Sequence, residues 1–82
     1  MVNGTVKVTS PTGINVEKAG QLVDLAVNYK SKIEYSKGSF TANAKSVLSI
    51  LASQVMVGDT LEFVCEGEDE ETALNAILDF FA

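Results

Sequence analysis

Apolar and polar residues alternate over residues 2–9, where Gly4, Val6 and Val8 fall on one face. A period of two predicts a strand with one buried side. From Val16 onward the apolar residues recur every three and four positions, which predicts a helix. The expected buried stripe of this helix consists of Val16, Ala19, Leu22, Val23, Ala26 and Val27.

The middle of the chain changes period twice. Apolar and polar residues alternate again over 33–35, and a tight turn at Lys37-Gly38 leads into a short strand at 39–42. Two strands joined by so short a turn predict a β-hairpin. Residues 47–53 are then mostly apolar, which indicates a short helix.

The last third of the chain predicts one strand and one helix. Leu61, Phe63 and Cys65 alternate with polar residues, with Val64 out of pattern. Acidic residues 69–71 suit the first turn of a helix, because the positive end of the helix dipole lies there. The expected buried stripe of this helix consists of Ala73, Leu74, Ala76, Ile77, Phe80 and Phe81.

The predicted order is therefore β-α-β-β-α-β-α, an α+β fold in one domain over residues 1–82. No repeat, linker or low-complexity segment interrupts it. The apolar stripes of the helices need a common surface to pack against. A four-stranded sheet with the helices on one face provides this surface. We expect Cys65 to be a buried core thiol, and Tyr29 and Tyr35 to pack with their hydroxyl groups at the surface.

The composition of the chain argues against several classes of binding partner. The chain has 6 lysines, no arginine and 11 acidic residues, with a formal net charge of -5. This balance argues against nucleic acid and anionic membrane surfaces, which are bound by clustered Lys and Arg. No signal peptide and no membrane-spanning run is visible, and the single cysteine excludes an internal disulfide. A cytoplasmic location is therefore expected.

The missing residue types exclude most catalytic chemistry. The chain has no histidine, so Ser-His and Cys-His pairs are impossible. Arginine, the usual bidentate clamp for phosphate, is absent as well. We therefore predict a protein that is not an enzyme and that needs neither a metal nor a cofactor.

Three segments resemble the HPr family, the phosphocarriers of the bacterial sugar phosphotransferase system. They are Thr12-Gly13-Ile14-Asn15, Asn43-Ala44-Lys45-Ser46-Val47-Leu48 and Glu66-Gly67-Glu68-Asp69-Glu70-Glu71-Thr72-Ala73-Leu74. The resemblance covers the chain in register. It implies an open-faced sandwich, in which a four-stranded antiparallel sheet carries three helices on one face. It also implies a monomer with protein partners.

The chain departs from this family at the phosphorylated position. The family has a histidine where this chain has Asn15, an arginine at Glu17 and a proline at Lys18. An amide nitrogen has no free lone pair, because it is delocalised into the carbonyl, so Asn15 cannot form a phosphoramidate. The chain is thus similar to the catabolite-repression HPr-like proteins, which also lack this histidine. Those proteins keep a regulatory serine, which corresponds to Ser46 of this chain. Asn15 also has a structural explanation, since Asn is among the best helix caps.

Ser46 and the helix after it are the second candidate site. Ser46 has two explanations: it can cap the short helix, or it can be the regulatory serine that an HPr kinase phosphorylates, as the resemblance implies. Val47, Leu48 and Leu51 either pack in the core, which suits Val47 best, or form a docking surface for partners. Asn15 and Glu17 are the other expected partner contacts.

The expected function is a regulatory role in carbon catabolite control, exerted through Ser46 and the adjacent apolar helix. HPr kinase, phosphotransferase components or a transcriptional repressor are the partners that the resemblance implies. The alternative is a non-phosphorylated interaction or decoy module that binds phosphotransferase components. A third possibility is a carrier that uses an unrecognised phosphate acceptor.

Overall fold

The computed structural model describes the whole chain, residues 1–82. Its elements follow in the predicted order. They are β1 (Val2–Lys7), α1 (Val16–Ala26), β2 (Lys32–Lys37), β3 (Phe40–Asn43), α2 (Val47–Ala52), β4 (Thr60–Glu66) and α3 (Glu70–Phe81). Strand β1 is shorter than expected, because the chain leaves the sheet after Lys7, although Val8 is still buried.

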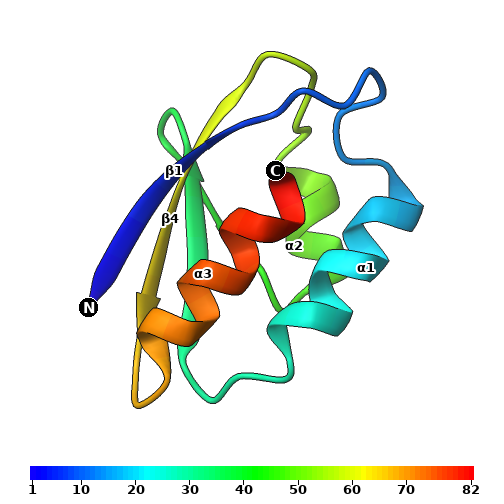
Figure 1. Cartoon of the computed structure of the whole chain (residues 1–82). Helices are drawn as coiled ribbons and strands as arrows, with labels where there is room; N and C mark the ends of the chain where they lie inside the picture. Colours follow the sequence, from blue (N-terminus) through cyan, green and yellow to red (C-terminus); the bar gives the residue numbers. More distant parts are fainter.

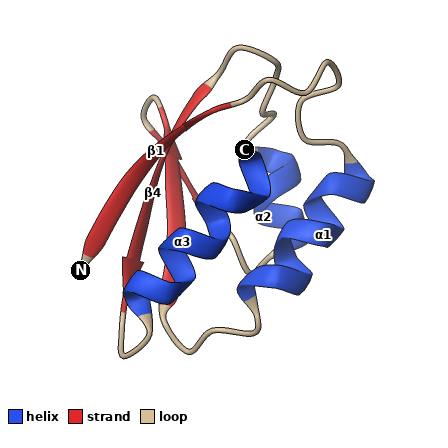
Figure 2. Cartoon of the chain, viewed as in Figure 1, coloured by secondary structure: helices blue, strands red, loops and turns tan.

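The sheet has the strand order β1-β4-β2-β3. Each neighbouring pair is antiparallel, so that β1 and β3 form the two edges. Figures 1 and 2 show α1, α2 and α3 together on one face of this sheet, with α3 lying diagonally across it. The predicted open-faced sandwich of four antiparallel strands and three helices is therefore confirmed.

The core lies between the inner face of the sheet and the helices. Leu61, Phe63 and Cys65 of the central strand β4 are fully buried, as their alternation predicts. The ring of Phe63 lies 5.0 Å from that of Tyr35 and 5.6 Å from that of Phe81, between centroids. The predicted burial of the Cys65 thiol is confirmed, and desolvation by that burial raises its pKa.

The buried stripe of α1 is narrower than the sequence predicts. Ala19, Leu22 and Ala26 are fully buried, but Val16 is 68% exposed and Val27 is 56% exposed. At 100° per residue around the helix, both valines lie to the same side of the stripe that Ala19, Leu22 and Ala26 form. The expectation that they belong to the core is therefore wrong, and α1 has apolar side chains left in contact with solvent.

The expectation for Tyr35 is also wrong. Its side chain is 1% exposed, and its hydroxyl group lies 2.7 Å from Ser53 Oγ inside the protein. Ser53 Oγ in turn donates a hydrogen bond to the carbonyl of Ile50, in the last turn of α2. This pair of hydroxyl groups therefore joins the sheet to the C-terminal end of α2.

Asp69 joins two loops at the other end of the sheet. Its carboxylate accepts hydrogen bonds from the backbone N–H groups of Lys30 and Ser31, each 2.9 Å long, and from Ser31 Oγ. The hydrogen bond from the Ser31 hydroxyl and those from the backbone lower the pKa of Asp69 from 3.8 to about 2. The sequence pattern placed Asp69 only in the first turn of a helix, so this contact was not predicted.

Tyr35 and Ser53 provide a test of the buried hydroxyl pair. We expect Tyr35→Phe to lower the free energy of unfolding by about 1 kcal/mol, since Ser53 keeps its bond to Ile50. Ser53→Ala should cost more, about 1–3 kcal/mol, because it leaves the buried phenol without a partner. Urea unfolding followed by circular dichroism measures both, and the double variant should cost less than the sum. Strict additivity would contradict the pairing.

Asp69→Asn should destabilise the protein at pH 7, because the ionised carboxylate is the form that the loop binds. The folded-state pKa lies below the unfolded value, so this contribution is complete above pH 4 and is lost as the pH falls towards about 2. The melting temperatures of the wild type and of Asp69→Asn should therefore converge over that interval. Glu68→Gln is the control, since Glu68 is exposed and lies 4.0 Å from Lys30. A difference that does not change with pH would contradict the role of the charge.

Candidate functional site

Asn15 lies exposed at the N-terminus of α1, where its side chain caps the helix. Its Oδ1 accepts a hydrogen bond of 2.9 Å from the Lys18 backbone N–H, which confirms the predicted cap. The preceding turn is held against the loop after α2, because the Ile14 N–H donates to the Val55 carbonyl over 3.1 Å. Gly13 has a φ of 64°, and a Cβ there would lie 2.8 Å from Met56 Cα. Only glycine fits this close approach without strain.

Glu17 and Lys18, which follow Asn15 in the first turn of α1, have different surroundings. Glu17 is exposed, whereas the Lys18 ammonium lies 5.0 Å from the centroid of the Phe80 ring. A pocket of about 100 Å³ opens beside Lys18. It is lined by Val8, Thr9, Ser10, Gly13, Ile14, Lys18, Phe80, Phe81 and Ala82.

Ser46 caps α2, as predicted. Its Oγ accepts a hydrogen bond of 3.2 Å from the Ser49 N–H, and Ser49 Oγ accepts one of 2.9 Å from the Asn43 N–H. The neighbouring Lys45 ammonium donates to the Tyr29 carbonyl over 2.6 Å, at the end of the turn after α1. The N-terminal end of α2 is thus tied to both β3 and the segment after α1.

The apolar residues of α2 divide between core and solvent. Ile50 is buried at 1% exposure, while Val47 and Leu51 are partly buried against the core. Leu48 is 81% exposed. Helix α2 therefore has one face in the core and presents Leu48 to solvent, two residues after Ser46.

The two candidate sites lie on adjoining elements. Helices α1 and α2 contact each other, and the loop after α2 packs against the turn that contains Gly13 and Ile14. The same loop presents Met56 at 65% exposure and Val57 at 55%. These two residues follow no helical or strand period, so their exposure was not predicted.

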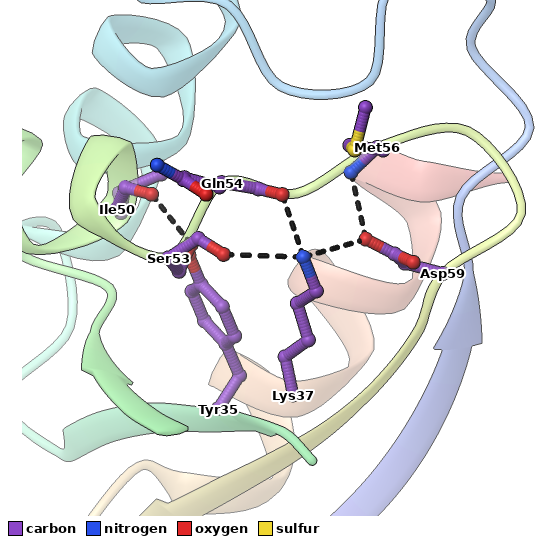
Figure 3. Close-up of polar contacts among 7 residues, drawn as sticks. All are labelled: Tyr35, Lys37, Ile50, Ser53, Gln54, Met56 and Asp59. Carbon is purple, nitrogen blue, oxygen red and sulfur yellow. Dashed lines mark hydrogen bonds and ion pairs between the residues drawn. The ribbon is translucent and has the colours of Figure 1, made fainter. Parts of the chain in front are cut away.

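Lys37 makes a second set of long-range contacts that the sequence pattern did not indicate. It is the last residue of β2 rather than part of the turn, and its ammonium reaches the far end of α2 (Figure 3). Lys37 Nζ donates to the carbonyls of Gln54, at 2.6 Å, and Ser53, at 3.3 Å, and lies 3.0 Å from Asp59 Oδ2. Asp59 Oδ2 also accepts the Met56 N–H at 2.8 Å. This bond and the Lys37 ammonium lower the pKa of Asp59.

No group of three or more potential metal-ligating His, Cys, Asp or Glu side chains converges in the structure. None of the three helices combines the length and the apolar character needed to cross a membrane.

The comparisons with known proteins agree with this architecture. The family described as "PTS HPr component phosphorylation site" matches residues 2–82. The phosphocarrier protein HPr of Treponema pallidum is 38% identical over 77 residues, which cover 94% of this chain and 88% of that protein.

Two solved structures are similar over nearly the whole chain. The crystal structure of HPr from Thermoanaerobacter tengcongensis has a TM-score of 0.95 and 31% identity, and covers 99% of this chain and 91% of that one. The crystal structure of the Bacillus subtilis catabolite repression protein Crh, described as a swapped dimer, has a TM-score of 0.79 and 28% identity, covering 99% and 93%. The fold, the matched family and the relatives agree, and the chain belongs to the HPr family of the phosphotransferase system.

Proposed function

We propose that this protein regulates carbon catabolite control through phosphorylation of Ser46 and docking on the adjacent surface of α2, and that it does not carry phosphate on residue 15. The observation that supports this most directly is the exposure of Leu48. An 81% exposed leucine two residues after the capping serine contributes nothing to the core. A partner that covers Leu48 would therefore contact the surroundings of Ser46 as well.

The chemistry of the Asn15 region argues against phosphate transfer. A carrier that holds phosphate on histidine needs the nucleophilic nitrogen of an imidazole, and the chain contains no histidine. The Asn15 side-chain oxygen is engaged in the helix cap, and its amide nitrogen is not nucleophilic. The exposed carboxylate of Glu17 would in addition repel a phosphoryl group.

Phosphorylation of Ser46 changes the docking surface without requiring a new fold. In the proposed step, Ser46 Oγ attacks the γ-phosphorus of ATP, the bond to the ADP oxygen breaks, and the hydroxyl proton passes to a base of an HPr kinase. The product carries about -1.5 to -2 charges at pH 7 beside an exposed leucine. A partner with an apolar contact and a cation placed for this phosphate would bind the modified form preferentially.

The proposed partners are an HPr kinase, phosphotransferase components and a transcriptional repressor. The catabolite-repression protein Crh of Bacillus subtilis is a relative whose description supports this role. We propose that the chain acts as a monomer, in contrast to the swapped dimer described for that protein.

Incubation with a purified HPr kinase and ATP tests the proposal. Mass spectrometry should find one added phosphate, on the peptide that contains Ser46. Ser46→Ala should abolish it, whereas the control Ser39→Ala in the exposed hairpin turn should not. Phosphoenolpyruvate and Enzyme I should label nothing in the chain. An unmodified wild type, or acid-labile label from Enzyme I, would overturn the proposal.

A non-phosphorylated interaction module is the second candidate. It is favoured by the hydrogen bond in which Ser46 Oγ already caps α2, because this bond explains the serine without any modification. In that case Leu48→Asp should abolish binding to Enzyme I or a transporter domain, and Ser46→Ala should leave the affinity nearly unchanged.

A further inference from the structure

Helices α1 and α2 lie side by side and run in opposite directions. The end of α1 adjoins the start of α2, because the Lys45 ammonium donates to the Tyr29 carbonyl. The start of α1 adjoins the segment after α2, because the Ile14 N–H donates to the Val55 carbonyl. The two helices also contact each other directly (Figure 1). Their outer sides therefore belong to one surface of the molecule.

An exposed apolar line runs along the flank of α1 that lies towards α2. Val16, Gly20 and Val27 follow at spacings of four and seven residues, so they share one line of the helix. Lys18 lies on the other flank of the buried stripe, where its ammonium reaches the Phe80 ring of α3. Because α1 contacts both α2 and α3, the apolar line lies on the side of α2. A Cβ at Gly20 would meet no heavy atom within 4 Å, so the middle of the line is open to a partner.

Leu48 continues this apolar surface on α2. It lies on the side of the helix opposite to the buried Ile50 and is 81% exposed. Because the start of α2 adjoins the end of α1, Leu48 and Val27 lie at the same end of the helix pair. The exposed residues of the two helices thus form one apolar face, which we call the helix-pair face. It consists of Val16, Gly20, Val27 and Leu48.

Two carboxylates border the helix-pair face on α1. Glu17 and Asp24 are seven residues apart, so they share a line of the helix next to the apolar line and further from the core. Both are exposed, and neither takes part in an ion pair of the protein. Lys18 is on the far flank, and Lys45 is engaged with the Tyr29 carbonyl. The face is therefore apolar at its centre and negative along one edge.

We propose that the helix-pair face binds a helix of a partner protein whose apolar stripe is flanked by lysine or arginine residues. Cations beside that stripe would face Glu17 and Asp24, whereas a helix flanked by acidic residues would be repelled. The 11 residues of α1 match about three turns of a helix laid along them.

This inference deepens the proposed function by naming the chemistry of the partner, and it rests on that function for the docking beside Ser46. A phosphate on Ser46 would add negative charge two residues from Leu48. It would therefore strengthen the attraction to the same cationic partner.

Two synthetic helical peptides of equal length test the inference. Both have the same leucine stripe, which is flanked by lysines in one and by glutamates in the other. Titrated into the isotope-labelled chain, the lysine peptide should shift the amide resonances of α1 and α2, including those of Gly20 and Leu48. The glutamate peptide should bind at least about tenfold more weakly at the same ionic strength. Shifts confined to another surface, or no binding of the lysine peptide, would overturn the inference.

Charge reversal separates the edge of the face from the net charge of the protein. Glu17→Lys with Asp24→Lys should weaken binding of the lysine peptide about tenfold and allow the glutamate peptide to bind. Glu62→Lys with Glu66→Lys is the matched control. It changes the net charge equally, at exposed positions that alternate with the buried residues of β4 and so face away from the helices. The control should change either affinity less than about threefold.

Equal effects of the two double variants would mean that net charge alone attracts the peptide, and would overturn the inference. If the variant with both lysines on α1 does not fold, Glu17→Gln with Asp24→Asn removes the same charges without reversing them. It should weaken binding of the lysine peptide about threefold, and an unchanged affinity would contradict the role of the carboxylates.

The peptide experiment separates this inference from the proposed function, because it uses the unmodified chain. A chain that HPr kinase leaves unmodified would overturn the proposed function, while the peptide affinities decide the inference. A chain phosphorylated on Ser46 should bind the lysine peptide about two- to fivefold more tightly. Weaker binding after phosphorylation would contradict a cationic partner.

Discussion

Helix α2 has only six residues, which is too short for a helix to be stable on its own hydrogen bonds. Side chains and backbone from neighbouring elements therefore fix it at both ends. The Ser46 cap and the bond between Ser49 and Asn43 hold its start. Tyr35 and Lys37 reach its end from β2. The position of every candidate partner contact on α2 depends on these bonds between the helix and the hairpin.

This constraint explains why α2 can present a leucine to water. Leu48 and Ile50 lie about 200° apart around the helix, so that turning Leu48 towards the core would expose Ile50. Polar bonds at both ends fix its rotation, so that Ile50 packs inside and Leu48 stays outside. The exposure of Leu48 is consequently a property of the hairpin and the caps as much as of the helix itself.

The sequence predicted the elements well because their signals are local. Alternation located three of the strands and a tight turn the fourth, and Asn15 and Ser46 were predicted as caps because a cap bonds to a residue three positions away. Asp69, Tyr35 and Lys37 were not assigned their roles. Their partners lie 16 to 39 residues away, and only the folded topology brings them together.

Only part of the candidate site was predicted, because only part of it has a local signal in the sequence. The apolar pattern of α2 and the resemblance indicated Ser46, Leu48 and Leu51, but the pattern could not separate exposed from buried members. Two further exposed apolar residues, Met56 and Val57, lie in an irregular loop that has no period to detect. Val16 and Val27 were assigned to the core because periodicity gives the direction of a stripe more reliably than its width.

The thiol of Cys65 has a practical consequence. It is fully buried in β4, which pairs with strands on both sides, and its raised pKa keeps it protonated at neutral pH. Cys65 pairs with Val2 at the start of the edge strand β1 and with Ile33 of β2, so an alkylating reagent can reach the thiol only when this part of the sheet opens. In a chain without tryptophan, the rate of cysteine labelling thus measures how often this end of the sheet opens.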